Sequence, residues 1–337
     1  MKYGDVSGSA VIDAPPIRNA PGQPPGTIIV RADGYWIVIP FKAKITFWGA
    51  INRVEDVNAN TWIQYEGKLG SDGVVAARAV HLTSNAVDPK EARLRRKLHY
   101  DPTSATTARN QSAMSLASTG VRLGPIHPWA DAGMQSRVER VGNSLVPLYQ
   151  KQLPASDPTK LTFRFIAVDA SWGDSPLPLP DGTILVPYQA VQRMQNDAQL
   201  AALLADAVAA VIDKNLLRME AATLETYKVK EIVADAAYVT LGLPAGIAAT
   251  WTAEQRAILR SEKDQSVRVS LMLMHDAGYD IWQAPLAWWM LSSGNKPLSA
   301  TEPPPASVEL YRTIAAVWSQ PSQTRILKAP AVDTATR

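Results

Sequence analysis

The sequence predicts an α+β protein in which a small N-terminal all-β domain precedes a larger domain of mixed helices and strands. Short runs of β-branched and aromatic residues, separated by turn signals, fill the stretch from Thr27 to Thr83. Apolar residues recur at helical spacing after Trp129 instead. The stretch between them, 86–124, has no sustained period. We therefore expect an all-β domain at 27–85 and an α+β domain at 125–320.

Composition narrows the class of protein and its partners. The chain has 337 residues, 34 of them basic and 31 acidic, a surplus too small to require nucleic acid, so we expect no nucleic-acid partner. With no cysteine, disulfides and thiolate chemistry are excluded. No apolar run approaches the ~18 residues of a membrane span. Asp5 and Asp13 interrupt any signal peptide, which predicts a cytoplasmic protein, or a periplasmic or secreted one whose signal has been removed.

The two ends of the chain and the junction between the domains are expected to lie outside the compact parts. Residues 1–26 are rich in Pro and Gly and predict an extended lead-in, poorly ordered unless it packs on a neighbour. Residues 321–337 form a tail. The junction 86–124 begins with a short basic helix, whose cations we interpret as a solvated face rather than a phosphate site.

Four segments carry the strand signal of the all-β domain: 27–39, 44–51, 61–69 and 74–82. Their lengths and turns predict a small antiparallel meander or an OB-like barrel. Trp36, Trp48 and Trp62 could stack on a base or a sugar. Filling of the core is the favoured interpretation, because large aromatic side chains mostly bury apolar area.

In the second domain the periodicity predicts a helix at 130–152, strands at 161–169 and 183–186, and a long helix at 198–214. Asn196 before that helix, with Gln199 three residues on, predicts a capping box. Prolines flank the strand at 183–186, so we expect it to lie at a sheet edge. Further helices are predicted at 216–239, 252–262, 264–277, 282–292 and 306–318.

Five blocks of this domain, in order, resemble the HtpX and CAAX prenyl endopeptidase superfamily of zinc metallopeptidases, which includes BepA-like proteases. They are VERVGNSLVPLYQKQLP, LTFRFIAVD, PLPLPDGTILV, NDAQLAALLADAVAAVI and QSVRVSLMLMHDAGYDIWQA, the last with a near-verbatim AGYD. The resemblance implies a zincin-like fold. It also implies that Thr183, Ile184, Leu185 and Val186 form the strand that receives a peptide substrate.

The zinc chemistry of that family does not carry over. Its HExxH motif places two histidines on one helix face with a glutamate as base, and a second helix adds a carboxylate ligand. The matching positions here are Asp206, Ala207, Ala210 and Gln265, and a downstream histidine of the family is matched by Glu302. Two alanines, one amide and one carboxylate cannot supply three zinc ligands, so we expect neither metal nor cofactor.

The sequence therefore predicts a non-catalytic metallopeptidase-like protein, a pseudopeptidase that binds a peptide or protein in the vestigial groove. The alternative is a hydrolase or peptidase with a rebuilt site. Candidate ligands for such a site exist, but solvated carboxylates and an exposed histidine are the favoured interpretation; they are Asp206, Asp213, Glu220, Glu225, His275 and Asp276. A serine hydrolase has no GxSxG turn to support it.

Overall fold

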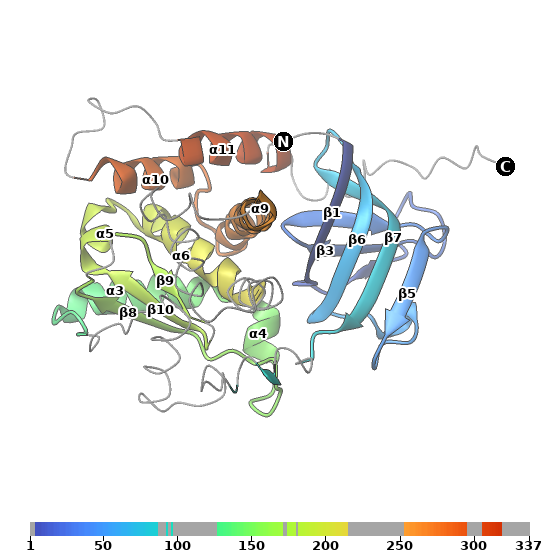
Figure 1. Ribbon diagram of the computed structural model, residues 1–337, viewed down its shortest axis with the longest axis horizontal. Helices are drawn as coiled ribbons and strands as arrows, with labels where there is room; N and C mark the ends of the chain where they lie inside the picture. Colours follow the sequence, from blue (N-terminus) through green and yellow to red (C-terminus); the bar gives the residue numbers. More distant parts are fainter. Residues whose placement is uncertain are drawn as a thin grey trace. The chain divides into compact units, whose positions relative to one another are not determined.

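The fold is α+β and divides into two compact units (Figure 1). The computed structural model describes residues 4–86, 92–93, 96, 127–170, 174–179, 181–214, 253–294 and 305–318, without the side chains of 253–263, 305 and 306. The first unit comprises the described parts of Met1–Asn85, Pro147–Gln152 and Val308–Arg337, and the second those of Ala86–Val146 and Leu153–Ser307. Most of the predicted basic helix and linker, and the predicted helix at 216–239, lie outside the residues described.

A seven-stranded mixed sheet forms the first unit. Its strands are β1 (Gly4–Val11), β2 (Ile17–Arg18), β3 (Ile28–Ala32), β4 (Tyr35–Ile39), β5 (Lys44–Trp48), β6 (Thr61–Leu69) and β7 (Val74–Ser84). Their order is β1-β6-β7-β4-β3-β2, with β5 pairing the second half of β7. The sheet is mixed, rather than antiparallel as expected, because β7 runs parallel to both β4 and β5.

The first strand corrects the predicted lead-in at residues 1–26. Strand β1 pairs with β6 along its whole length, from Gly4↔Leu69 to Val11↔Trp62. A bridge between Ile12 and Ala32 then joins the end of β1 to β3 and curls the sheet toward a barrel. The prediction failed because the prolines begin only after this strand, whose own residues are mostly small and weakly patterned.

Alternation along the strands separates a core face from an outer face. Core residues come from every long strand, among them Ala10, Ile28, Val30, Ile37, Ile63, Tyr65, Val80 and Leu82. The helix η4 (Ile314–Trp318) also contributes, because Val317 is buried in this core. Residues up to 320 were assigned to the α+β domain from sequence, so this segment belongs to a different unit from the one predicted.

The three tryptophans of the first unit were expected to fill its core, and the structure agrees only in part. Trp36 packs against a small cluster formed by Ile29, Val38 and Val74, as core filling requires. Trp48 does not, because 68% of its surface is exposed. The side chain of Trp62 is partly exposed as well.

The second unit combines a three-stranded sheet with helices. Its strands are β8 (Arg164–Val168), β9 (Leu177–Pro178) and β10 (Thr183–Pro187), and its helices are α3 (Ala132–Leu145), α5 (Tyr188–Arg193), α6 (Asp197–Ile212), α9 (Ala253–Asp276) and α10 (Gln283–Ser293). Helix α11 (Pro305–Thr313) spans the division between the units. The predicted helix at 130–152 is two helices, α3 and α4 (Leu148–Gln152), because Pro147 lacks the amide hydrogen that would continue the ladder.

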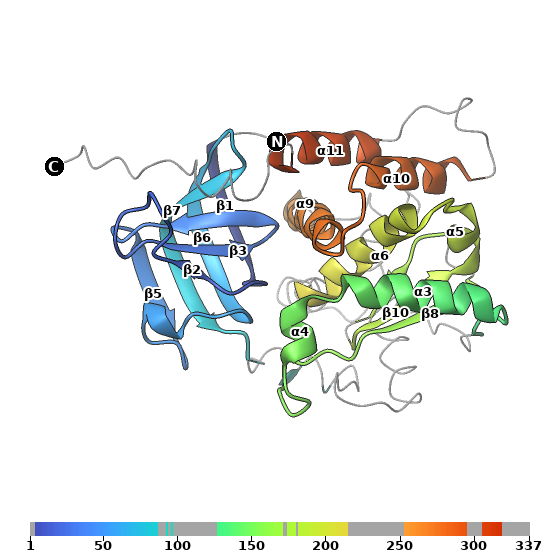
Figure 2. The ribbon, with the colours of Figure 1, turned by 180° about the vertical axis from the view of Figure 1, so that it is seen from behind.

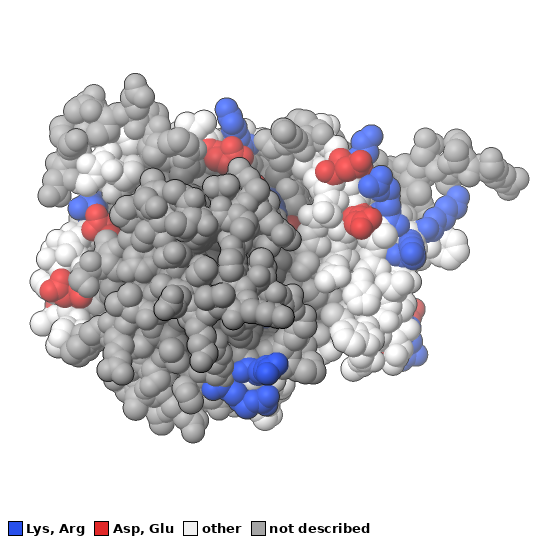
Figure 3. Space-filling view, in the orientation of Figure 1, with Lys and Arg blue, Asp and Glu red and all other residues white. Residues whose placement is uncertain are grey.

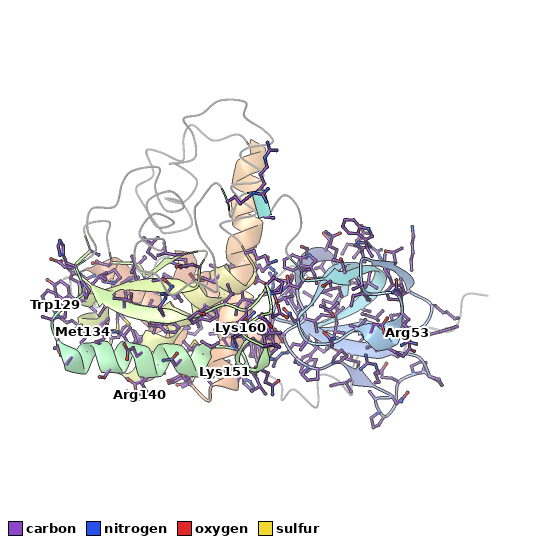
Figure 4. The ribbon with its side chains drawn as sticks, turned by 90° about the horizontal axis from the view of Figure 1, so that it is seen from below. Arg53, Trp129, Met134, Arg140, Lys151 and Lys160 are labelled. Atoms are coloured by element: carbon purple, nitrogen blue, oxygen red, sulfur yellow. The ribbon has the colours of Figure 1, made fainter. Side chains whose placement is uncertain are left out.

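Helix α6 lies at the centre of this unit. It packs against α3, α9 and α10 and also contacts β9 and β10. Figure 2 shows α3, in green, in front of β8 and β10, and Figure 4 shows the same helix alongside the sheet with Met134 and Arg140 labelled. Among the residues described, no helix is long and apolar enough to cross a membrane.

Candidate functional site

Helix α6, which carries three of the positions matched to the zinc site of that family, begins with the predicted cap. Asn196 Oδ1 accepts a hydrogen bond from the Gln199 amide at 2.9 Å. The side chain of Gln199 returns to the amide of Gln195 at 2.8 Å, one residue before the cap. Gln283 of α10 ties this end of the helix down, since its Oε1 accepts from Gln199 Nε2 at 3.1 Å. The start of α6 is therefore fixed by side chains from two helices.

The middle of α6 is buried nearly all round. Ala207 is 3% exposed and Ala210 is 7% exposed, and of the three matched positions on this helix only Asp206 is partly exposed. A helix that is apolar on every side belongs in a protein interior. Asp213, expected to be a solvated carboxylate, is buried at the helix end, and that expectation was wrong. His275 in the last turn of α9 is exposed, as expected.

The fourth matched position lies on the helix that packs against α6. Gln265, in the second half of α9, is buried, with 5% of its surface exposed. The two helices thus bring together the segments that hold Asp206, Ala210 and Gln265, while the convergence of these three side chains stays a prediction. Within the described ranges no group of three His, Asp or Glu side chains has metal-binding geometry. Glu302, Glu220 and Glu225 lie outside those ranges.

The predicted edge strand is a central strand. Strand β10 pairs in parallel with β8, from Thr183↔Arg164 to Pro187↔Val168. On its other side it pairs with β9, at Ile184↔Pro178 and Leu185↔Leu177. Thr183, Ile184, Leu185 and Val186 therefore offer no free edge over most of their length, and the groove expected there is contradicted. The prolines mark the short edge strand β9 instead.

The outer edge of β8 is closed by a side chain. Gln135 of α3 donates through Nε2 to the Phe165 carbonyl at 2.8 Å and accepts at Oε1 from the Ala167 amide at 2.8 Å. Its amide thus replaces one peptide unit of a neighbouring strand. Further along, the Trp129 amide donates to the Ala167 carbonyl at 2.8 Å. Nothing in the sequence pattern distinguishes Gln135 from an exposed helix glutamine, so this role was not predicted.

The turn between β9 and β10 buries a carboxylate. Asp181 is fully buried, accepts the Thr183 amide at 2.9 Å and lies 3.2 Å from Arg164 Nη2. Burial raises the pKa of Asp181 above its ordinary value, against the lowering effects of the Thr183 amide and the Arg164 guanidinium. Gly182 follows with a φ of +92°, a conformation that glycine adopts readily. The contacts of Asp181 with Arg164 and with the Thr183 amide hold the turn in place.

A second carboxylate joins α3 to the start of α6. Asp197 accepts from Arg137 Nε at 2.9 Å and from Arg140 Nη2 at 2.8 Å. Burial acts to raise the pKa of Asp197, but the hydrogen bonds from the two guanidinium groups outweigh it, so its pKa lies below the ordinary value. Arg137 also donates to the Met194 carbonyl at 3.2 Å. These contacts orient α6 against α3.

The AGYD segment links α9 to α10 and reaches α3. Tyr279 Oη lies 3.1 Å from Ser144 Oγ of α3. Asp280 Oδ1 accepts the Trp282 amide at 3.0 Å, just before α10 begins. Gly278 has a φ of +78°, so the turn after α9 requires a residue that tolerates the left-handed region. Each of these contacts positions an element of the second unit.

Comparison with known proteins adds no relative. A scan against models of protein families finds no match, and no curated protein matches the chain. The resemblance to zinc metallopeptidases therefore rests on the five sequence blocks alone.

Proposed function

We propose that this chain is a non-catalytic, metallopeptidase-like protein that acts by binding a peptide or protein. The observation that carries the proposal is the pair of alanines at 207 and 210, buried in the centre of α6. Neither has a lone pair to offer a metal, and neither leaves room for an imidazole without displacing its packed neighbours.

The neighbouring positions support the same conclusion. Asp206 supplies one carboxylate, and Gln265 on α9 supplies an amide oxygen, which is a weak zinc ligand. A catalytic zinc takes three protein ligands and keeps a fourth position for water. With this set of donors, the water-activating chemistry of a zinc peptidase has no basis at these positions.

The family's mode of peptide binding is not part of the proposal. Adding a peptide as an extra strand requires unpaired backbone groups along an exposed edge. Strand β10 is paired on both sides, and Gln135 satisfies the exposed side of β8. A partner would therefore dock through side chains, through the two-residue edge strand β9 or through another part of the chain.

A peptidase assay tests the proposal. The full chain is incubated with a fluorogenic peptide library, with and without added zinc, beside a variant carrying Asp206→Ala and Gln265→Ala. We expect no cleavage by either protein. Zinc-dependent cleavage by the native chain that disappears in the variant would show a working site at these residues and overturn the proposal.

A partner search completes the test. Tagged native protein is used to capture ligands from an extract, and captured proteins are then measured for direct binding in purified form. The proposal predicts a protein or peptide that binds the native chain and is recovered uncut. Capture of a peptide that is cleaved on incubation with the pure chain would contradict it.

A further inference from the structure

The outer face of the first unit's sheet carries a surface that the proposed function does not use. Register places Trp62, Thr83 and Trp48 in one row across β6, β7 and β5. The same row begins at Val11 of β1, which is buried and is not counted in the surface. A second row contains Ser9, Gln64, His81 and Thr46 across β1, β6, β7 and β5. Residues directly opposite one another on paired strands share a face, and the core residues Ile63 and Leu82 lie on the other face. We call these seven side chains the tryptophan face.

The tryptophan face combines an exposed indole with side chains that are held in place by hydrogen bonds. Trp48 is 68% exposed although it lies in a regular strand. Thr46 Oγ lies 2.9 Å from His81 Nδ1 and 3.3 Å from the Val80 carbonyl, so the middle of the second row is held in one arrangement. An exposed indole beside ordered polar groups is typical of a surface that takes a ligand with both an apolar and a polar side.

The tryptophan face contains no Asp, Glu, Lys or Arg. Charged residues lie toward the other end of the same strands and are of both signs, with Arg78 3.2 Å from Asp5, and with Glu66, Lys68 and Lys44 in the neighbouring rows. Figure 3 shows acidic and basic residues side by side on this unit, next to a wider white area without charged residues. A nucleic acid needs a basic track for its phosphates, and this surface provides none.

We propose that the tryptophan face binds an uncharged oligosaccharide. A sugar ring has one face of C–H groups, which stacks on an indole, and a rim of hydroxyls, which bond with neutral donors and acceptors. Gln64, His81, Thr46 and Thr83 supply such groups beside the two tryptophans. Trp48 and Trp62 are two strands apart, about 10 Å, so the ligand spans several linked rings. The site lies in the first unit and is independent of the zinc positions.

Titration of the full chain with three neutral hexasaccharides tests this proposal. The probes are cellohexaose, hexa-N-acetylchitohexaose and maltohexaose, and binding is followed by calorimetry and by tryptophan fluorescence. We expect saturable binding of at least one. Trp48→Ala should weaken it about tenfold or more, since loss of one stacking platform costs roughly 1–3 kcal/mol. Because Trp48 is exposed, this variant should keep its fold.

Phe41→Ala is the matched control. Phe41 is 73% exposed but lies in the turn between β4 and β5, against Gly26 and off the tryptophan face. Its loss should leave the affinity within about twofold, as for a surface substitution outside a site. Three results would overturn the proposal: no saturation by any probe up to about 10 mM, equal losses in both variants, or preferential binding of a twelve-residue oligo(dT) that Trp48→Ala abolishes.

Discussion

Gly142 of α3 lies directly against the ring of Phe165 in β8. A Cβ placed on Gly142 would be 2.4 Å from Phe165 Cδ1 and Cγ, which is well inside van der Waals contact. Gly142→Ala should therefore lower the free energy of unfolding by about 1–3 kcal/mol through overpacking. This loss is expected even though alanine favours a helix by up to ~1 kcal/mol over glycine. Urea denaturation followed by tryptophan fluorescence measures it.

The neighbouring residue provides the control for that substitution. Asn143 is exposed on the same helix, so Asn143→Ala tests helix propensity without changing the contact. It should leave stability unchanged or raise it by a few tenths of a kcal/mol, ~0.5 at most. If Gly142→Ala is as stable as Asn143→Ala, the close approach of α3 to the sheet is wrong.

Gln135 should behave as part of the sheet. Gln135→Ala removes both hydrogen bonds to β8 and should cost about 1–3 kcal/mol, because the Phe165 carbonyl and the Ala167 amide are left unpaired. Gln135→Glu keeps an acceptor for Ala167 but loses the donor to Phe165. Hydrogen exchange separates the two variants: the Ala167 amide should exchange faster in Gln135→Ala and stay protected in Gln135→Glu. Equal protection in both would show that the side chain does not cap this edge.

The substitution Asp181→Asn should show how the buried carboxylate makes the stability of the protein depend on pH. Burial raises the pKa of Asp181 in the folded protein above the unfolded value of about 3.9, so folding favours the protonated carboxyl. The stability that this protonation contributes is fully present below about pH 3.9 and is lost as the pH rises through the folded pKa. Native protein should therefore gain stability relative to Asp181→Asn as the pH falls from 7 to 4. Urea midpoints of the two proteins across this range measure the effect. A gap that stays constant would contradict it.

Asp197→Asn should show the opposite dependence on pH. The pKa of Asp197 is lowered in the folded state, so its contribution is present above about pH 3.9 and is lost as the pH falls through the folded pKa. About a third of this side chain is exposed, so screening limits the contribution to about 0.5–1 kcal/mol at pH 7. Native protein and Asp197→Asn should converge in stability in acid. Divergence there would refute the role given to Arg137 and Arg140.

Local signals in the sequence predicted several elements of the second unit, although the helices predicted at 252–262 and 264–277 are the single helix α9. The cap at Asn196 and the start of α6 follow from one side chain and its partner three residues on, and both are confirmed. The strands at 161–169 and 183–186 were also found, because apolar runs bounded by turn residues are a local property. Their order in the sheet depends on pairing between distant segments, which such signals do not contain.

The wrong prediction that β10 is an edge strand illustrates this limit of local sequence signals. The prolines around 183–186 were interpreted as marking an edge, and they do mark one, but on the hairpin partner β9. Leu179 donates to the Thr183 carbonyl at 2.8 Å, and Pro178 falls opposite Ile184, where the alternation of an antiparallel pair places no amide hydrogen bond. Proline is therefore tolerated beside a central strand without interrupting it.

Three other features could not be predicted from the sequence, for similar reasons. Strand β1 is a run of small residues whose place in the sheet is decided by its partner β6, and Val317 enters the core of the first unit from near the other end of the described chain. The exposure of Trp48 also depends on register, because only pairing with Thr83 places its side chain on the outer face. Tertiary pairing overrode the average behaviour of each residue type.

Zinc content measured by elemental analysis tests the central claim most directly. The full chain is purified without chelators, incubated with a small excess of zinc and desalted before measurement. Two alanines, one carboxylate and one amide cannot hold a catalytic zinc, so we expect less than about 0.1 zinc per chain. One zinc per chain, lost in the variant with Asp206→Ala and Gln265→Ala, would show that these residues bind zinc and would contradict the claim that the metal site has been lost.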